Sequence, residues 1–349
     1  MRQLTIILLL LVLVAACGPA PTPTPDLVAT QVAIMEAAAA TMTAQAPTPI
    51  PPATLAPSQT PTVGPTSSAT PTSAATVVPT ATDLPGATPR PATPTPAIGP
   101  SLGRFAVAGV YSDDVLNVRS APGVSNMIVG TIPYHGRNVN VFAGVEMVDD
   151  AWWVPVRYQE LNGWVNSSFL ARQAGDVADE LAARTAQAIL AVRDHDMQQL
   201  ASLVHPVKGV TFSPYTNVRP LQGAPGQADL VFSPDQVREL WTDSTEYLWG
   251  QYDGTGEPIE MTFGAYSQRF VYDVDFAQPD VIGFGETIGQ GNTINNISEV
   301  FPGSTAVEYH FEGFDPQYAG MDWRSLRLVW EQVDGIWYLV AIVHDEWTI

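Results

Sequence analysis

Short runs of alternating hydrophobic and polar residues, separated by turn residues, fill the chain between about residues 104 and 172. Leu116 and Val118 fall on one side of such a run and Asn117 and Arg119 on the other, before the turn at 120–123. Further runs of this kind follow at 128–132, 139–141, 153–157 and 163–165. Several short strands in one small segment are typical of a barrel, so the pattern predicts a small all-β domain over residues 104–172.

Beyond residue 175 the hydrophobic period changes to that of a helix. Apolar residues recur at helical spacing from about 176 to 192, and Asp196 is a suitable N-cap for a second helix over 197–204. The sequence Ser233-Pro234-Asp235 predicts the start of a third helix.

The end of the chain returns to the strand period. Alternation predicts strands at 305–312, 325–333 and 336–344, and Asp334-Gly335 between the last two is a strong hairpin signal. Helices followed by antiparallel strands predict an α+β domain over residues 175–349.

Apart from the apolar run at 4–16 and an alanine-rich run at 26–46 that is compatible with a short helix, the first hundred residues have neither period. Residues 18–102 hold 19 of the 31 prolines, whereas every aromatic residue lies at or beyond Phe105. Because a segment of this composition cannot bury an apolar core, we predict a disordered Pro/Thr/Ala-rich linker over residues 17–102.

An apolar run from Leu4 to Ala16 follows Arg2 and ends at Cys17, the only cysteine of the sequence. The run is too short to span a bilayer. It resembles a bacterial lipoprotein signal peptide over residues 1–16, whose cleavage would leave Cys17 as the lipidated first residue. The resemblance implies an extracytoplasmic protein that is anchored to the cell membrane through its N-terminal lipid.

The charge balance restricts the partners. The chain has 35 Asp and Glu residues against 15 Lys and Arg residues, a formal net charge of −20 at pH 7. Such a chain repels nucleic acid and anionic lipid head groups, so we predict no nucleic-acid partner. Neutral, zwitterionic and cationic partners remain compatible with the composition.

Four motifs in residues 104–172 resemble the bacterial SH3-like (SH3b, type 3) domain. They are Leu116–Gly123 (LNVRSAPG), Val129–Ile132, Trp153–Arg157 and Gly163–Val165. Their order and spacing agree with the family, and the chain departs from it in a longer stretch at 142–151. The family is associated with recognition of peptidoglycan peptides, so the resemblance implies a cell-wall partner.

A barrel of this type binds an extended peptide in a shallow groove lined by aromatic faces and a few polar groups. Five residues are the predicted groove candidates: Tyr111, Asn117, Arg119, Trp153 and Tyr158. Two of them have an alternative role, because Arg119 beside a turn can fix its loop and Trp153 can shield one end of the barrel.

The segment beyond residue 175 resembles the opening of NTF2-like domains, in which helices and a curved sheet form a cone. It is also similar to the C-terminal part of uncharacterised bacterial surface lipoproteins. The matching signatures are His205-Pro206, Phe212–Tyr215, Gly320–Trp323 and His344–Trp347. The NTF2-like resemblance implies a cone that can enclose a small ligand, whereas the resemblance to surface lipoproteins implies no activity.

The sequence gives limited support for catalysis. It contains no HExxH and no GxSxG motif, so we predict no catalytic metal and no cofactor. His344 beside Asp345 is the candidate general base at a pocket mouth, with a core histidine as the alternative. Acidic clusters offer carboxylate pairs for glycan cleavage or weak calcium sites. These clusters are Asp273 with Asp275, the same two with Asp280 for calcium, and Glu308 with His310 and Glu312.

Three hypotheses follow. The first is an adaptor, in which the lipid fixes one end of the chain, the barrel engages wall peptide, and the linker sets the effective concentration between them. The alternatives are a cell-wall hydrolase and a binder of small solutes, both using the pocket of the C-terminal domain.

Overall fold

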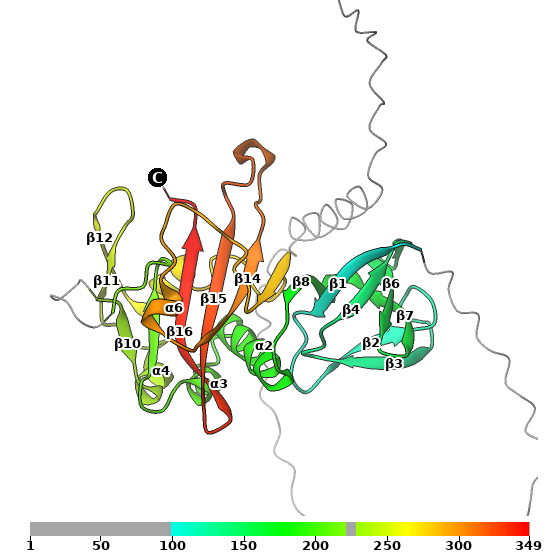
Figure 1. Ribbon diagram of the computed structural model, residues 1–349, viewed down its shortest axis with the longest axis horizontal. Helices are drawn as coiled ribbons and strands as arrows, with labels where there is room; N and C mark the ends of the chain where they lie inside the picture. The colour runs from blue at the N-terminus through cyan, green and yellow to red at the C-terminus, as the bar shows by residue number, and fades with distance from the viewer. Residues whose placement is uncertain (1–98, 221–227, 349) are drawn as a thin grey trace, which may run out of the picture.

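The computed structural model describes residues 99–220 and 228–348, which form a small barrel beside a larger unit of helices and strands (Figure 1). The predicted signal peptide, Cys17 and nearly all of the predicted linker lie outside the described residues. In the described residues, no helix has the length and apolar character needed to cross a membrane.

The barrel contains all five strands that the sequence predicts and three more. Its elements are β1 (Ser101–Val107), β2 (Val115–Arg119), β3 (Ile128–Pro133), β4 (Val139–Phe142), β5 (Glu146–Val148), β6 (Ala151–Tyr158), β7 (Leu161–Asn166), the 3-10 turn η1 (Ser167–Phe169) and β8 (Leu170–Gly175). The predicted alternation in β2 is confirmed, because Leu116 and Val118 are buried in the barrel core while Asn117 and Arg119 are half-buried.

The helices of the larger unit are α2 (Asp179–Arg193), α3 (Met197–Leu203), α4 (Pro234–Glu239), α5 (Phe263–Phe270) and α6 (Ile297–Val300). The first three are confirmed predictions. Asp196 caps α3 by accepting a hydrogen bond of 2.9 Å from the backbone N–H of Gln199, and Ser233 forms a capping box with Gln236 at the start of α4.

Six strands of the larger unit lie in the order β10-β9-β16-β15-β14-β13. Their bounds are β9 (Val210–Ser213), β10 (Leu230–Phe232), β13 (Val281–Phe284), β14 (Thr305–Phe311), β15 (Arg324–Val333) and β16 (Ile336–Glu346). A separate ribbon pairs β11 (Tyr247–Gln251) with β12 (Pro258–Met261), and the 3-10 turn η2 (Pro316–Tyr318) lies between β14 and β15. The predicted hairpin is confirmed, since Asp334 and Gly335 have φ of 52° and 83° between β15 and β16.

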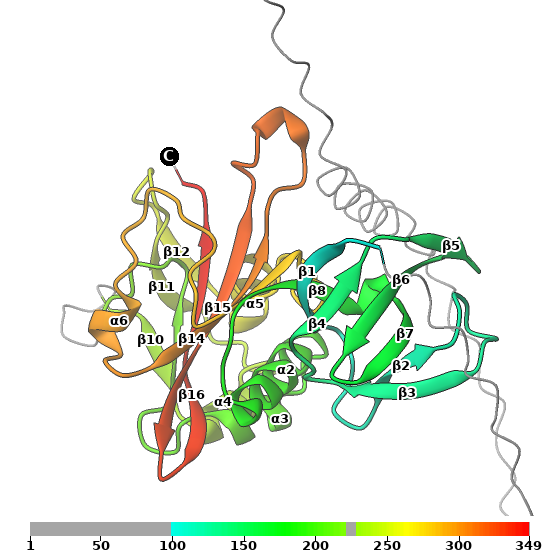
Figure 2. The ribbon, with the colours of Figure 1, turned by 45° about the vertical axis from the view of Figure 1, so that its right-hand side comes forward.

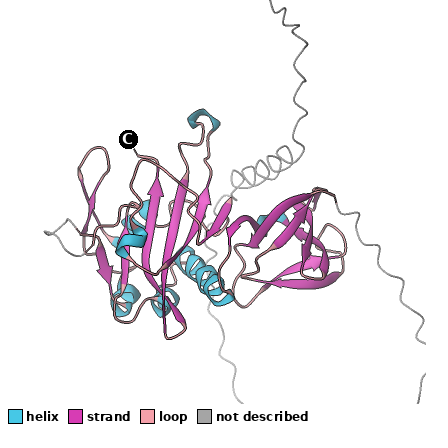
Figure 3. Ribbon diagram, in the orientation of Figure 1, coloured by secondary structure: helices cyan, strands magenta, loops and turns pink. Residues whose placement is uncertain are grey.

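The two faces of this sheet are covered by different segments (Figure 3). Residues of α2, α3 and α5 share one large core with apolar side chains of β9 and β13–β16. On the other face, Ile297 of α6 packs in a smaller cluster with Val329, Ala341 and Val343. The strands β14–β16 are therefore buried on both faces.

The barrel and the larger unit share one continuous sheet (Figure 2). Strand β8 pairs with β1 of the barrel along one edge and runs parallel to β13 along the other, from Arg172 opposite Val281 to Gly175 opposite Phe284. Gly175 has φ of 67°, and a Cβ there would lie 2.2 Å from the carbonyl oxygen of Phe284. Only glycine fits this crossing without a shift of the backbone.

Candidate functional site

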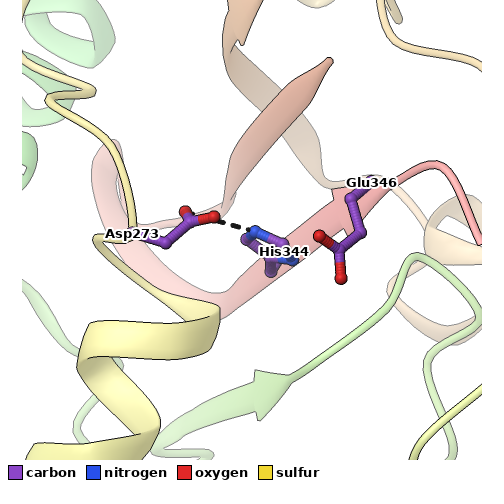
Figure 4. A group of neighbouring side chains, drawn as sticks. All are labelled: Asp273, His344 and Glu346. Atoms are coloured by element: carbon purple, nitrogen blue, oxygen red, sulfur yellow. Dashed lines mark ion pairs between the residues drawn. The ribbon is translucent and has the colours of Figure 1, made fainter. Parts of the chain in front are cut away.

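His344, the predicted general base, is buried on β16 with 0% exposure. Its Nε2 lies 3.3 Å from Oδ1 of Asp273, which is in the loop after α5 (Figure 4). The predicted pairing with Asp345 does not form, because consecutive residues of a strand point to opposite faces of the sheet. Asp345 Oδ2 instead accepts a hydrogen bond of 2.7 Å from Nη1 of Arg327 on the other face.

Glu346 lies near His344, two residues further along the same face of β16, and completes a group of three potential metal ligands with Asp273 and His344 (Figure 4). The two carboxylates of this group are each already paired with an arginine. Arg324 Nε lies 2.9 Å from Asp273 Oδ2, and Arg269 Nη2 lies 2.5 Å from Glu346 Oε1. A divalent cation here would lie beside two guanidinium groups, so the charges of this group do not suit a metal.

Electrostatics explain the charge state of Asp273. Burial by itself would raise the pKa of this carboxyl, but the close contact with His344 and its charge, together with the charge of Arg324, outweigh burial and lower the pKa. Asp273 therefore remains ionised as an internal partner of His344 and Arg324. With no exposed ring atom, His344 has the position of a core histidine.

The predicted calcium site is not formed. Asp273 and Asp275 lie in the irregular segment between α5 and β13. Asp275 accepts hydrogen bonds from Tyr272 Oη at 2.5 Å and from Gln278 Nε2 at 3.0 Å. Asp280 accepts one of 3.0 Å from the backbone N–H of Glu312. Each carboxylate thus has its own local donor, and the three do not converge.

A second buried polar cluster surrounds Arg327 on the other face of the sheet. Its Nε donates to Glu308 Oε2 at 3.0 Å, and its Nη2 donates to the carbonyl of Gly289 at 2.7 Å. Glu308 also accepts hydrogen bonds from Ser325 Oγ at 2.6 Å and from the backbone N–H of Gly289 at 2.8 Å. These hydrogen bonds connect the loop after β13 to the sheet, so the cluster has a structural role.

The predicted cluster of Glu308, His310 and Glu312 is divided by these contacts. His310 Nδ1 lies 2.8 Å from Ser325 Oγ, in hydrogen-bonding contact beside Glu308, whereas Glu312 forms an ion pair of 2.5 Å with Arg172. Burial lowers the pKa of His310, despite the opposing charge of Glu308. Glu308 and His310 are both buried, so this group does not line an open pocket.

The interior of the larger unit is filled by aromatic rings. Trp249 stacks on Tyr266 with ring centroids 3.8 Å apart, and Phe212 meets both rings edge-on. The cavity among α2, α3 and α5 has a volume of about 10 Å³. That volume is at the lower limit for a single water molecule, so this cavity is too small for the solute or glycan that the alternative hypotheses require.

In the barrel, Arg119 fixes the loop that follows its strand. Nη1 of Arg119 donates a hydrogen bond of 2.8 Å to the carbonyl of Asn126, and Asn126 Nδ2 donates one of 2.6 Å to the carbonyl of Pro122. Asn117 lies two residues before Arg119 on β2, opposite Thr131. Both predicted residues remain half-buried at the surface of the barrel.

Trp153 does not line an open groove, contrary to its prediction. Its side chain is 3% exposed, and Nε1 donates a hydrogen bond of 3.3 Å to the carbonyl of Val148. The extra stretch at 142–151 forms β5, which pairs with β6 beside Trp153. The neighbouring Trp152, which is not among the predicted residues, is half-buried and lies opposite Met147, which is 52% exposed.

The two predicted tyrosines lie near the larger unit. The ring of Tyr111 is half exposed, and the guanidinium of Arg193 in α2 lies 5.0 Å from its centroid. Tyr158 lies at the end of β6, where burial first, and then the charge of Asp179, raise the pKa of its phenol. The five predicted residues therefore do not share one groove.

The four SH3b-like sequence motifs fall on strands β2, β3, β6 and β7, and the order of these strands agrees with the order of the motifs. Residues 114–171 match the family model of the bacterial SH3 domain. Such SH3b domains commonly bind cell-wall peptidoglycan, so the match suggests a cell-wall-binding role for this part of the chain. No curated protein matches the chain.

The SH3b barrel carries apolar side chains where two of its loops meet. A Cβ on Gly123 would lie 2.9 Å from a methyl group of Val148, so the loop at 120–127 touches the β5–β6 hairpin. Apolar residues lie on both segments: the exposed Val124 and Met127 on the loop, and the exposed Met147 with the half-buried Trp152 opposite it, on the face of the hairpin that points away from Val148. We call these four residues the loop patch. Arg119 supports the patch through the loop that it fixes.

A cavity of about 420 Å³ lies where the SH3b barrel meets the start of α2. Its walls come from the β3–β4 loop, the β6–β7 turn and the first turn of the helix. We call it the junction cavity, and it is lined by His135, Arg137, Asn138, Tyr158, Gln159 and Asp179 among others. Tyr158 is the one predicted groove residue that it contains.

Proposed function

We propose that this protein is a lipid-anchored adaptor of the cell surface that binds peptidoglycan peptide through its SH3b barrel. The observation that carries the proposal is the family match over residues 114–171. The structure contains every strand that the motifs of this family predict for the barrel. Exposed apolar patches on soluble domains mark interaction sites, which favours the loop patch as the ligand surface.

The anchor is supported by the sequence of the N-terminus. The apolar run before Cys17 has the length of a signal peptide, and the proline-rich segment after it has the composition of a spacer. Attachment at Cys17 would restrict the barrel to the region next to the membrane and raise its effective concentration at the wall.

We infer an NTF2-like fold for the larger unit. Support comes from the two helices that precede the hairpin β9–β10, and from the helices that share one core with the sheet. With its aromatic interior and its sheet joined to β8, this unit suits a rigid support for the barrel better than a container for a ligand.

Co-sedimentation of the full chain with purified peptidoglycan sacculi tests the adaptor. The wild-type chain should pellet with sacculi and release no fragments, and the variant Trp152→Ala/Met147→Ser should lose about tenfold in affinity, as expected for an aromatic hot spot. Met321→Ser is the matched control, since Met321 has 50% exposure but lies outside the barrel.

Three results would contradict the proposal. Without any pelleting of the wild-type chain, the barrel has no wall ligand. If Trp152→Ala/Met147→Ser pelleted as well as the control Met321→Ser, the loop patch would not be part of the binding surface. Released sugar or peptide fragments would instead identify an enzyme.

A further inference from the structure

The junction cavity is built by both units of the chain. Its volume of about 420 Å³ falls within the range of about 300 to 1,000 Å³ that is usual for small-ligand sites, and such sites occur preferentially at domain interfaces. The loop patch, in contrast, belongs to the barrel alone. The cavity is therefore a separate candidate site.

The walls of the cavity are fixed by bonds that cross the junction. Arg137 Nη2 lies 2.6 Å from Asp179 Oδ1, and its Nε lies 3.1 Å from Asp176 Oδ1. Asn138 donates from Nδ2 to Asp176 Oδ2 at 3.0 Å and from its backbone N–H to Gln173 Oε1 at 2.7 Å. Because β8 and β13 share a sheet beside these contacts, the backbone walls of the cavity are preformed.

The groups left for a ligand are polar and mostly uncharged. Tyr158 and Gln159 are consecutive residues at the turn and both line the cavity, so a hydroxyl and an amide are present on the same wall. The aromatic ring of Tyr158 and the imidazole of His135 also line the cavity, and burial lowers the pKa of that imidazole and favours its neutral form. The second carboxylate oxygen of Asp179 remains an acceptor.

Charge selects among ligand classes. Arg137 is already paired with two carboxylates, and the chain as a whole is strongly acidic, which disfavours an anion. Asp179 is paired with Arg137, which weakens its attraction for a cation. Donors and acceptors around an aromatic ring, without net charge, suit a neutral ligand with several hydroxyl or amide groups.

We propose that the junction cavity binds a neutral saccharide of one or a few sugar units. This inference rests on the proposed wall-binding function, since the glycan strands of a wall would supply such a ligand beside the peptide held by the barrel. It assigns the helix α2, through Asp179, a direct part in recognition. Peptide and glycan would then be contacted by one rigid unit.

The test uses a β-1,4-linked N-acetylglucosamine tetramer as the probe, with isothermal titration calorimetry on the full chain. The variant Tyr158→Phe/Gln159→Gly removes the hydroxyl and the amide, keeps the ring, and suits the φ of 52° at residue 159. Its affinity for the tetramer should fall about tenfold or more, as expected for two lost hydrogen bonds. Glu160→Gln, in the same turn but outside the cavity lining, should bind as the wild type does.

Absence of binding by the wild-type chain at millimolar tetramer would overturn the inference, and so would unchanged affinity in the double variant with an unchanged melting temperature. Sedimentation with sacculi separates this outcome from failure of the adaptor. If the wild-type chain pellets through the loop patch but does not bind the tetramer, only the inference of a saccharide site is contradicted. If the wild-type chain binds the tetramer while Trp152→Ala/Met147→Ser pellets normally, the saccharide site is supported and the loop patch is not the wall-binding surface.

Discussion

Nε2 of His344 lies 3.3 Å from Oδ1 of Asp273, across the core from a loop that is distant in the sequence. The ring is fully buried, and Phe270 contacts it edge-on at 5.9 Å between ring centroids. We expect His344→Ala to lower the free energy of unfolding by about 1–3 kcal/mol, as is usual for loss of a buried polar partner. Urea denaturation measures the change. A variant with wild-type stability would contradict this structural role.

The two adjacent tryptophans of β6 should respond differently to truncation. Trp153→Ala removes a buried ring and should cost about 3–5 kcal/mol of unfolding free energy. Trp152→Ala, at a half-buried position, should cost clearly less and should affect ligand binding instead. Unfolding followed by circular dichroism compares them, and equal losses would refute the assignment of Trp153 to the interior.

Coupling of the barrel to the larger unit depends on the crossing at Gly175. Gly175→Ala should destabilise both units together, because the added Cβ would lie 2.2 Å from the carbonyl oxygen of Phe284. Gly256→Ala is the control, since Gly256 has a similar φ of 71° with open space around it. Differential scanning calorimetry should show one unfolding transition, and its melting temperature should fall further for Gly175→Ala than for Gly256→Ala. Two independent transitions in the wild-type chain would show that the units are not coupled.

The buried arginine cluster should be sensitive to loss of its cation. Arg327→Met leaves Glu308 and Asp345 buried without their partner, for an expected loss of about 3–5 kcal/mol. Arg238→Met, which breaks a surface pair with Asp235, should change stability little. Chemical denaturation of both variants checks the contrast. Similar small effects would mean that the cluster does not hold the loop after β13.

The depressed pKa of His310 predicts a pH dependence of stability. In the unfolded chain this imidazole takes up a proton near pH 6.5, whereas burial lowers its pKa in the folded protein. The unfolded state therefore binds more protons in this window, and the His310 contribution to stability falls as the pH drops below about 6.5. In His310→Gln, the free energy of unfolding, measured from pH 7.5 to 5, should lose this part of its dependence on pH. An unchanged slope would contradict the burial of a neutral ring.

Local features of the fold could be read from the sequence because they depend on near neighbours. The period of two in β2, the capping groups Asp196 and Ser233, and the turn Asp334-Gly335 each involve residues a few positions apart. Their hydrogen bonds and burial follow from local geometry, so five of the eight barrel strands, the first two helices and the start of the third were predicted near their observed positions.

Part of the candidate site was also open to prediction. Tyr158 was among the expected ligand residues and lines the junction cavity. Glu346 was missed, although its place two residues after His344 on one strand face was a usable signal. Trp152 was missed because two adjacent tryptophans do not show which ring the preceding β5 segment covers.

The sequence by itself determined five barrel strands, the first three helices and the last three strands, together with the acidic charge, the motifs of an SH3b barrel and the apolar run that ends at Cys17. Only the tertiary structure decided that β8 joins the barrel to β13, that His344 meets Asp273, and that Arg137 meets Asp179. These contacts join residues far apart in the chain. They depend on how the strands align and which faces pack together, and a local pattern of hydrophobic and polar residues does not specify either.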